Sequence, residues 1–257
     1  MSDASTEKSL FDKNRRPFLL RKIHSLTGIL PVGGFLVFHL WTNANALQGQ
    51  QRFQEAVGNI THMPYLPLLE VGILGPLAFH ALYGVKLALE GKPNVGAYPY
   101  SRNWMYTLQR TTGILAFAFI VYHLYEYWFQ KVAEKMAEDQ FYAALCSNMS
   151  STWKGIPVVA LVYIVGIAAS VFHFANGLWG FCFSWGITVS KRAQRSAATV
   201  FGLVGLVLFL LGANTAIYFA TGSELPGKWL GAIGGGDSDK MTRTCQDIAR
   251  GPGKDSH

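Results

Sequence analysis

The chain has 257 residues, of which half are hydrophobic and only 14% are charged, whereas soluble domains usually carry about 25% charged residues. This composition excludes an ordinary water-soluble enzyme and predicts an all-α integral membrane protein whose apolar helices cross the bilayer. The net charge of +7 requires no nucleic acid partner, because basic residues that flank membrane helices near anionic lipid account for it.

The apolar residues fall into five runs, each long enough to cross a bilayer as a helix. In chain order they cover residues 21–46, 66–90, 103–129, 156–188 and 196–220. We therefore predict a single bundle of five transmembrane helices over residues 21–220. The polar residues 1–20 have the composition of a flexible lead-in or docking segment, and the glycine-rich, charged residues 221–257 have that of a loosely ordered tail.

Basic residues predict the orientation of this bundle. They precede the first run and lie between runs two and three and between runs four and five, whereas the other two loops carry few. By the positive-inside rule, the N-terminus faces the cytoplasm and the C-terminal tail lies outside. No small-residue cleavage site follows a short apolar core, so the first run is expected to be retained as a helix.

Four histidines lie inside the first four runs: His39, His80, His123 and His173. An ionisable side chain at membrane depth is costly and needs a partner within the bundle. A single such residue would be explained by packing or by a proton relay. Four of them on four helices are satisfied together by two metal centres that each bind two imidazoles, which predicts two b haems.

The depth of these histidines predicts how they pair. With a rise of 1.5 Å per residue, His39 and His123 lie roughly 27 and 30 Å above the inner ends of their helices. His80 and His173 are on helices that run inward, and they lie roughly 21 and 22 Å below the outer ends. We therefore predict an outer pair, His39 with His123, and an inner pair, His80 with His173.

Small residues accompany the histidines on the same helices. Gly28 and Thr112 each precede the histidine of their helix by about three turns, and Gly166 precedes His173 by about two. Such residues would leave room for the haem of the other pair. They would equally let helices pack closely, as small residues do throughout membrane proteins, so both interpretations remain open.

Two carboxylates lie in apolar runs near the predicted outer face. Glu70 is early in the second run, and Glu126 follows His123 by one helical turn. A quinone that is reduced near the outer haem must take up protons, and a carboxylate close to water can supply them. The alternative is an interfacial carboxylate that merely reaches water.

Polar residues near the predicted inner face are candidates for the haem propionates. Basic and hydrogen-bonding side chains neutralise such carboxylates. For Gln109, Arg110, Lys191 and Arg192, an anchor of the third helix at the inner interface explains the residues nearly as well. The candidates are His24, Ser25, Gln109, Arg110, Lys191 and Arg192.

The three cysteines have different predicted roles. Cys182 lies in the fourth run and is expected to pack there. Cys146 and Cys245 both fall on the predicted outer side, where a disulfide can persist. They would either tie the tail to the loop after the third helix or remain two separate thiols, because sequence does not decide pairing.

Five stretches of the chain carry a resemblance to a known family. They are RKIHSLTGILPVGGFLVFHL (21–40), FHALYGV (79–85), YSRNWMYTLQRTTGI (100–114), HLYE (123–126) and FHFANGLWGFCFSWGITV (172–189). In this order and spacing they resemble the five-helix, two-haem cytochrome b subunit of type B succinate:quinone oxidoreductases. The resemblance covers roughly residues 20–220.

The resemblance implies haem ligation by the four histidines in the same two pairs. It also implies a membrane anchor in a bacterial cytoplasmic membrane, bound to a flavoprotein subunit with FAD and to an iron–sulfur subunit. The succinate site would then lie outside this chain. Electrons would pass from the iron–sulfur subunit through both haems to menaquinone near Glu70.

The direction of the reaction has one clue. Fumarate reductases of this family that carry a compensating proton pathway have a glutamate two residues before the histidine of the fourth helix, where this chain has Val171. The resemblance therefore favours succinate dehydrogenase, with fumarate reductase as the alternative.

Two other functions remain open at this point. One is the quinone-reactive cytochrome b of a hydrogenase or formate dehydrogenase, which would co-purify with metal subunits instead of a flavoprotein. The other is a haem-free transporter that uses intramembrane histidine and glutamate. The chain lacks the paired halves with broken helices of many transporters, and haem spectra would separate the two classes.

Overall fold

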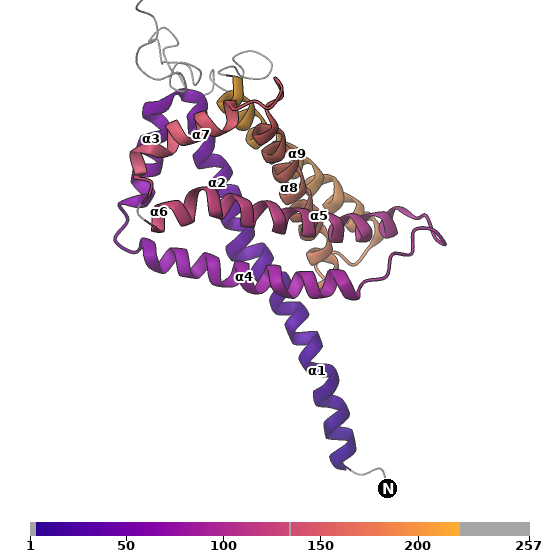
Figure 1. The fold of residues 1–257 in the computed structure, drawn as a ribbon. Helices are drawn as coiled ribbons and strands as arrows, with labels where there is room; N and C mark the ends of the chain where they lie inside the picture. The colour runs from indigo at the N-terminus through magenta and orange to yellow at the C-terminus, as the bar shows by residue number, and fades with distance from the viewer. Residues whose placement is uncertain (1–3, 134, 222–257) are drawn as a thin grey trace, which may run out of the picture.

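A computed structural model describes residues 4–133 and 135–221 of the chain (Figure 1). Within these residues the secondary structure is helical, and the only β-type pairing is an isolated bridge between Trp153 and Ile156. The predicted tail over residues 221–257 lies outside the described residues, apart from Thr221 at the end of the last helix.

The helical elements follow the chain in this order. They are α1 (Ala4–Thr27), the π-helical η1 (Gly28–Gly33), α2 (Gly34–Asn43), the 3₁₀ turn η2 (Ala44–Gln48), α3 (Gln50–Thr61), α4 (Leu66–Glu90), α5 (Ser101–His123), the π-helical η3 (Leu124–Phe129), α6 (Gln130–Val132), the 3₁₀ turn η4 (Glu138–Gln140), α7 (Phe141–Ser150), α8 (Val158–Ser184) and α9 (Lys191–Thr221).

Four stretches of the described chain are long and apolar enough to cross a membrane. They are Arg15–Gln48, Leu66–Glu90, Val158–Ser184 and Lys191–Thr221. They coincide with four of the five predicted runs, which makes this a multi-pass membrane protein. The remaining run, 103–129, forms α5 and η3 but does not reach the same hydropathy, because the first half of α5 carries polar side chains from Asn103 to Thr112.

The first membrane segment is helical over a longer stretch than expected. A flexible lead-in was predicted before residue 21, but α1 already begins at Ala4 and projects from the body of the molecule (Figure 1). Polar composition alone therefore did not predict this helix, and the role of the segment as a lead-in or a docking segment stays a prediction. Further along, Pro31 lacks an N–H donor, and the helix passes it as the π-helical η1.

Two predicted loops contain helices of their own. The loop after the first segment forms α3, and the loop before α8 forms α7. Both lie at the end of the molecule opposite the N-terminus (Figure 1). We call the cluster that α3, α7 and the last turns of α9 build there the cap. Its most completely buried large side chains are Phe53, Tyr142 and Phe219.

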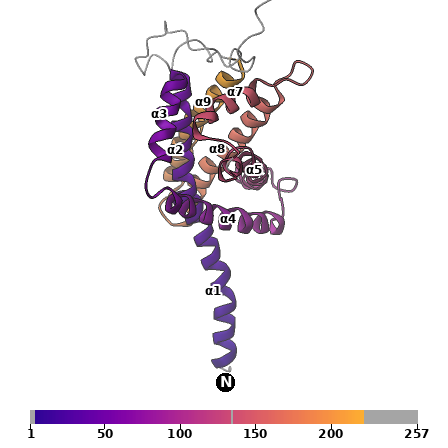
Figure 2. The same cartoon turned by 60° about the vertical axis from the view of Figure 1, so that its left-hand side comes forward.

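The central helices do not all run side by side. α5 and α8 are antiparallel neighbours, because Asn176 bonds to Met105 O near one end and Tyr163 meets His123 near the other. By contrast, α4 lies across α1 and α2 (Figures 1 and 2). The depths assigned above assumed that every helix runs straight through the bilayer, and α4 departs from that assumption.

Glycines allow the closest helix contacts. A Cβ atom at Gly205 of α9 would lie 2.8 Å from the Cβ of Ala175, and one at Gly212 would lie 2.9 Å from Ile167. These contacts seat α9 along α8 with opposite chain direction. The last helix, α9, therefore packs along α8. It contains no histidine.

Cys146 is fully buried in the cap and is disulfide-bonded, whereas Cys182 is a buried free thiol in α8. Cys245 lies outside the described residues, so its predicted pairing with Cys146 stays a prediction.

Replacement of Phe219 by alanine should destabilise the protein through the cap. Phe219 is 1% exposed and packs against Phe53 and Tyr142, and removing a buried phenyl ring costs about 3–5 kcal/mol. We expect a clear fall in the unfolding midpoint of the detergent-purified protein. Leu210→Ala is the matched control, because Leu210 lies on the same helix but is 55% exposed; equal losses for both variants would contradict the assignment of the cap as a packed core.

Candidate functional site

The outer pair of histidines comes together at the junction of two helices. His39 lies on α2 and His123 is the last residue of α5. Their ring centroids are 5.6 Å apart, and the ring planes are inclined by 74°. Both side chains are partly buried between helices, as a ligand-binding position requires.

The inner pair joins two other helices. His80 of α4 and His173 of α8 have ring centroids 6.0 Å apart and planes inclined by 81°. The two contacts join the same residues that were paired from depth, although α4 lies across the first helix.

A small hydrophobic cluster, separate from the cap, joins α2, α8 and α9. It consists of Leu40, Val171 and Leu208.

The rings of the inner pair are each fixed by a backbone carbonyl. His80 Nδ1 lies 2.9 Å from His24 O, and His173 Nδ1 lies 3.0 Å from Gln109 O. A carbonyl can only accept, so Nδ1 carries the proton in each ring and Nε2 keeps its lone pair. This is the arrangement typical of imidazoles that bind a metal through Nε2.

A second contact holds His173 against α5. The Gln109 side-chain amide donates to His173 O over 3.0 Å, and Asn176 donates to the Gln109 side-chain oxygen over 2.7 Å. Gln109 was predicted to meet a haem propionate. In the structure it instead ties the backbone of α8 to α5 beside the histidine.

The outer pair has side-chain partners. His123 Nδ1 lies 3.2 Å from the Tyr163 hydroxyl on α8. The Asn43 amide nitrogen is 3.4 Å or more from the ring nitrogens of His39, and it bonds more closely, at 2.8 Å, to the His39 carbonyl. Of the two outer rings, His123 is therefore the one with a defined hydrogen-bond partner.

Glycines lie directly against the inner pair. A Cβ atom at Gly28 would collide with the ring of His80, and one at Gly113 would lie 2.9 Å from the ring of His173. Gly28 was among the predicted small residues. Thr112 was predicted as well, but its hydroxyl bonds to Leu108 O in its own helix, and the next residue, Gly113, is the one at the histidine.

The third predicted small residue serves a different contact. A Cβ at Gly166 would collide with the ring of Phe119, which in turn stacks near His123 at 5.9 Å. Gly166 therefore lets α8 approach α5 close to the outer pair. Of the two interpretations left open above, close packing accounts for this glycine directly.

The donor set fits a haem better than a free metal ion. Within the described residues, no group of three or more His, Cys, Asp or Glu side chains could enclose a metal. A porphyrin supplies the equatorial ligands itself and requires only axial ones from the protein. The described residues offer two such pairs of imidazoles, with ring centroids 5.6 and 6.0 Å apart.

Two of the propionate candidates have a buried nitrogen without a hydrogen-bond partner among the described residues. His24 stacks on His80 with centroids 4.1 Å apart, and its Nε2 is buried without a hydrogen-bond partner among the described residues. Arg110 Nε is buried in the same unsatisfied state, and Arg21 lies close enough for their charges to repel. Buried donors of this kind are costly unless something pairs with them, and a propionate would.

The other propionate candidates are less engaged. Ser25 accepts a hydrogen bond from the Trp185 indole and donates one to Lys22 O. Lys191 and Arg192 are exposed at the beginning of α9. Arg110 itself also lines a hollow of about 230 Å³ with Gly91 and Tyr106, so its role as an interfacial anchor of α5 remains compatible with the structure.

The two predicted carboxylates are both held by partners. Glu70 forms an ion pair with Lys131 at 3.2 Å, and the two side chains are 29% and 24% exposed. Glu126 accepts a hydrogen bond from Asn148 over 3.0 Å. Since Lys131 and Glu126 follow His123 closely along the chain, both carboxylates gather at the end of α5 that carries the outer pair.

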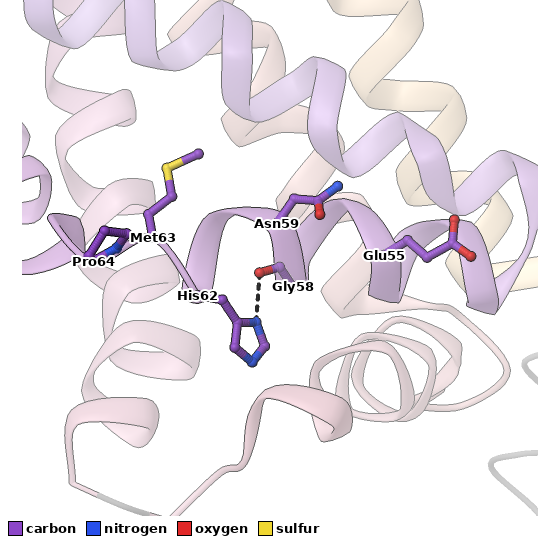
Figure 3. A pocket seen from close by; sticks show the side chains of 6 residues that line it. All are labelled: Glu55, Gly58, Asn59, His62, Met63 and Pro64. Carbon is purple, nitrogen blue, oxygen red and sulfur yellow. Dashed lines mark hydrogen bonds between the residues drawn. The ribbon is translucent and has the colours of Figure 1, made fainter.

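A separate hollow at the end of α3 brings no ligand set together. It has a volume of about 680 Å³ and is lined by Glu55, Gly58, Asn59, His62, Met63 and Pro64. His62 bonds to Gly58 O at 2.7 Å, and the side chains of His62 and Glu55 point away from each other (Figure 3). This hollow therefore offers no counterpart to the two histidine pairs.

Several residues of the site were not predicted from sequence. Tyr163, Lys131 and Asn148 supply the partners of His123, Glu70 and Glu126, and Gly113 lies against His173. Of these residues, only Gly113 lies in a stretch that carries the family resemblance, residues 100–114. The others are ordinary tyrosine, lysine and asparagine residues whose neighbours come from distant parts of the chain.

Comparison with known proteins decides the family. Over 205 residues the chain is 38% identical to the succinate dehydrogenase cytochrome b558 subunit of Bacillus subtilis (strain 168), and the match covers 79% of this chain and 98% of that protein. The chain belongs to the succinate dehydrogenase cytochrome b family. This confirms the family predicted from the sequence motifs.

Two further matches agree with membership of the succinate dehydrogenase cytochrome b family. Residues 92–212 match the family described as succinate dehydrogenase/fumarate reductase transmembrane subunit. The chain is also 34% identical over 64 residues to the succinate dehydrogenase hydrophobic membrane anchor subunit of Halobacterium salinarum, a match that covers 25% of this chain and 48% of that protein. As a member of this family, the chain is a membrane-anchor subunit of an oxidoreductase complex.

Proposed function

We propose that this anchor subunit carries two b haems and passes electrons from an iron–sulfur subunit to menaquinone. The observation that supports it most is the presence of two separate histidine pairs, at 5.6 and 6.0 Å, in an apolar multi-helix chain. A haem bound by each pair would supply reversible one-electron transfer. His39 and His123 would hold the outer haem, and His80 and His173 the inner one.

Other residues of the chain would orient the histidine ligands and neutralise the haem propionates. The carbonyls of His24 and Gln109 fix the inner imidazoles with Nε2 free. The unsatisfied nitrogens of His24 and Arg110 would bind propionates, and Ser25 and Lys191 stay weaker candidates for the same role. Buried cations and donors of this kind stabilise carboxylates strongly.

The carboxylates would serve proton exchange with the quinone. Glu70 and Glu126 lie at the end of α5 that carries the outer pair, where electrons would leave the chain. A carboxylate held in place by Lys131 or Asn148 can take up a proton from water and, as the carboxylic acid, pass it to a reduced quinone.

Succinate oxidation is the direction we propose, with fumarate reduction as the alternative. Both named relatives are succinate dehydrogenase subunits, and Val171 occupies the position of the glutamate found in the fumarate reductases that carry a proton pathway. Succinate is a weak reductant for menaquinone. Electrons that leave a negative interior toward the outer face gain about 2.3 kcal/mol per charge per 100 mV of membrane potential, which would drive the step.

We further propose five membrane crossings in a bacterial cytoplasmic membrane, with α5 as the additional one. The N-terminus would face the cytoplasm, where a flavoprotein and an iron–sulfur subunit would dock, and the C-terminal tail would lie outside. Single cysteines at Gly96 and His62 test this topology. A membrane-impermeant thiol reagent should label G96C only from the cytoplasmic side and H62C only from outside; labelling of both from one side would contradict it.

The proposed cofactor content has a direct test. The purified chain should give a reduced-minus-oxidised spectrum typical of b haems, with two haems per chain by quantification. One haem per chain, or folded protein without a Soret band, would refute the proposal.

Replacement of Glu70 by glutamine should slow quinone reduction in the assembled complex. The amide keeps the size of the side chain but cannot exchange the proton, so succinate:quinone activity should fall by about 10²-fold or more, the range typical of the loss of a general acid–base group. Electron transfer from succinate to an artificial acceptor at the flavoprotein, and the haem content, should be unchanged. Glu90→Gln is the control, because Glu90 pairs with Lys86 at the far end of the same helix; equal activity in E70Q and wild type would argue against a role for Glu70.

A further inference from the structure

Tyr163 is a buried tyrosine that the proposed chemistry does not yet use. It lies on α8, is 5% exposed, and belongs to the same packed cluster as the cap. Its hydroxyl is 3.2 Å from Nδ1 of His123. It thus reaches from one helix to the outer-pair histidine of another.

A polar group surrounds this hydrogen bond. The Tyr127 ring, which is 8% exposed, packs against His123, and its hydroxyl accepts from the Asn148 amide over 3.5 Å. A hydroxyl oxygen can accept, so the Tyr163 oxygen is able to take a hydrogen bond from Nδ1–H of His123. That places the imidazole proton on Nδ1 and leaves Nε2 free to bind a metal.

This contact differs from those of the other three histidines. The rings of His80 and His173 are held by backbone carbonyls, which no substitution of a side chain can delete. The amide of Asn43 is a donor and meets His39 only at long range. Of the four rings, the one on His123 has an Nδ1 partner that is a side-chain oxygen, at 3.2 Å.

We propose that Tyr163 is a positioning residue that fixes the orientation of the His123 ring and sets the reduction potential of the outer haem. The proposal rests on the haem ligation proposed above. An acceptor at Nδ1–H makes the imidazole a better electron donor through Nε2, and a more basic axial ligand favours the oxidised iron. Loss of the acceptor therefore raises the reduction potential.

Tyr163→Phe tests this role in the purified complex. The ring and its packing stay, and only the hydroxyl is removed. We expect two haems per chain, a raised midpoint potential for one of them in a redox titration, and a changed low-spin ferric electron paramagnetic resonance signal for that haem alone. The affected haem should be the one that a His123→Leu variant lacks.

Tyr122→Phe is the matched control. Tyr122 lies beside His123 in sequence and packs against the Tyr163 ring at 6.1 Å, but its hydroxyl makes no contact with the histidine among the described hydrogen bonds. Y122F should keep both potentials of the wild type. Y127F removes the second hydroxyl of the cluster around His123, and it should shift the same haem as Y163F but by less.

The outcomes separate this inference from the function on which it rests. Wild-type protein without haem would overturn both. Two haems with unchanged potentials and resonance signals in Y163F would overturn only the role of Tyr163, as would a shift of equal size in both haems or in Y122F. If Y163F does not accumulate as folded protein, Y127F carries the test alone: a shift confined to the outer haem supports the role, and none overturns it.

Discussion

Replacement of His123 by leucine is expected to leave a folded subunit that has lost one of its two haems. Leucine fills a similar volume but offers no lone pair, so the iron at that pair would lose an axial ligand. His39→Leu should remove the same haem, because the centroids of the two rings lie only 5.6 Å apart. His80→Leu and His173→Leu should each remove the other haem.

Haem quantification and redox titration of the four single variants measure this result. Each should contain about half the haem of the wild type, and the potential that disappears should be common to the two members of a pair. His62→Leu is the control, since His62 is exposed at the end of α3 and should leave both haems in place. If H39L and H80L lost the same haem, the proposed pairing would be wrong.

The second large effect is expected at Gly28. A side chain there would run into the ring of His80, and overpacking of a close helix contact costs about 1–3 kcal/mol. His80 cannot simply move away, because its Nδ1 is bound to His24 O and its ring is stacked on His24. Gly28→Leu should therefore abolish binding of the inner haem while the outer haem remains.

Gly34→Leu is a close control for this substitution. Gly34 lies on the same membrane segment, but a Cβ there would meet nothing within 4 Å. Spectra and haem content of G34L should equal those of the wild type. Retention of both haems in G28L, or equal losses in G28L and G34L, would show that Gly28 is not needed to seat His80.

The family and the chemical groups of the site were predictable from the sequence. Histidines and glutamates inside apolar runs stand out, because an ionisable side chain in a membrane segment is costly and therefore marks a site. The same reasoning could not find Tyr163 or Lys131. A tyrosine in an apolar helix and a lysine just after an apolar run are ordinary residues until the fold places them against His123 and Glu70.

Local structure was predicted well where composition alone decides it. Four apolar runs became helices that are long and apolar enough to cross a membrane. The helical N-terminal segment and the helices of the cap were not predicted. The cap helices α3 and α7 are short, and their packing depends on side chains such as Phe219, which comes from the far end of the described chain. Short helices of this kind are stabilised by tertiary packing more than by their own propensity.

A helical membrane protein with four intramembrane histidines, and one favoured way of pairing them, could be predicted before any fold was known. Hydrophobic length and the cost of buried ionisable groups are properties of the chain alone. Other features depend on how the helices pack: the crossing of α4 over the first segment, the glycines on which the inner rings lie, and the different Nδ1 partners of the two pairs. Those contacts join residues far apart in sequence, and only the packing of whole helices fixes which of their faces meet.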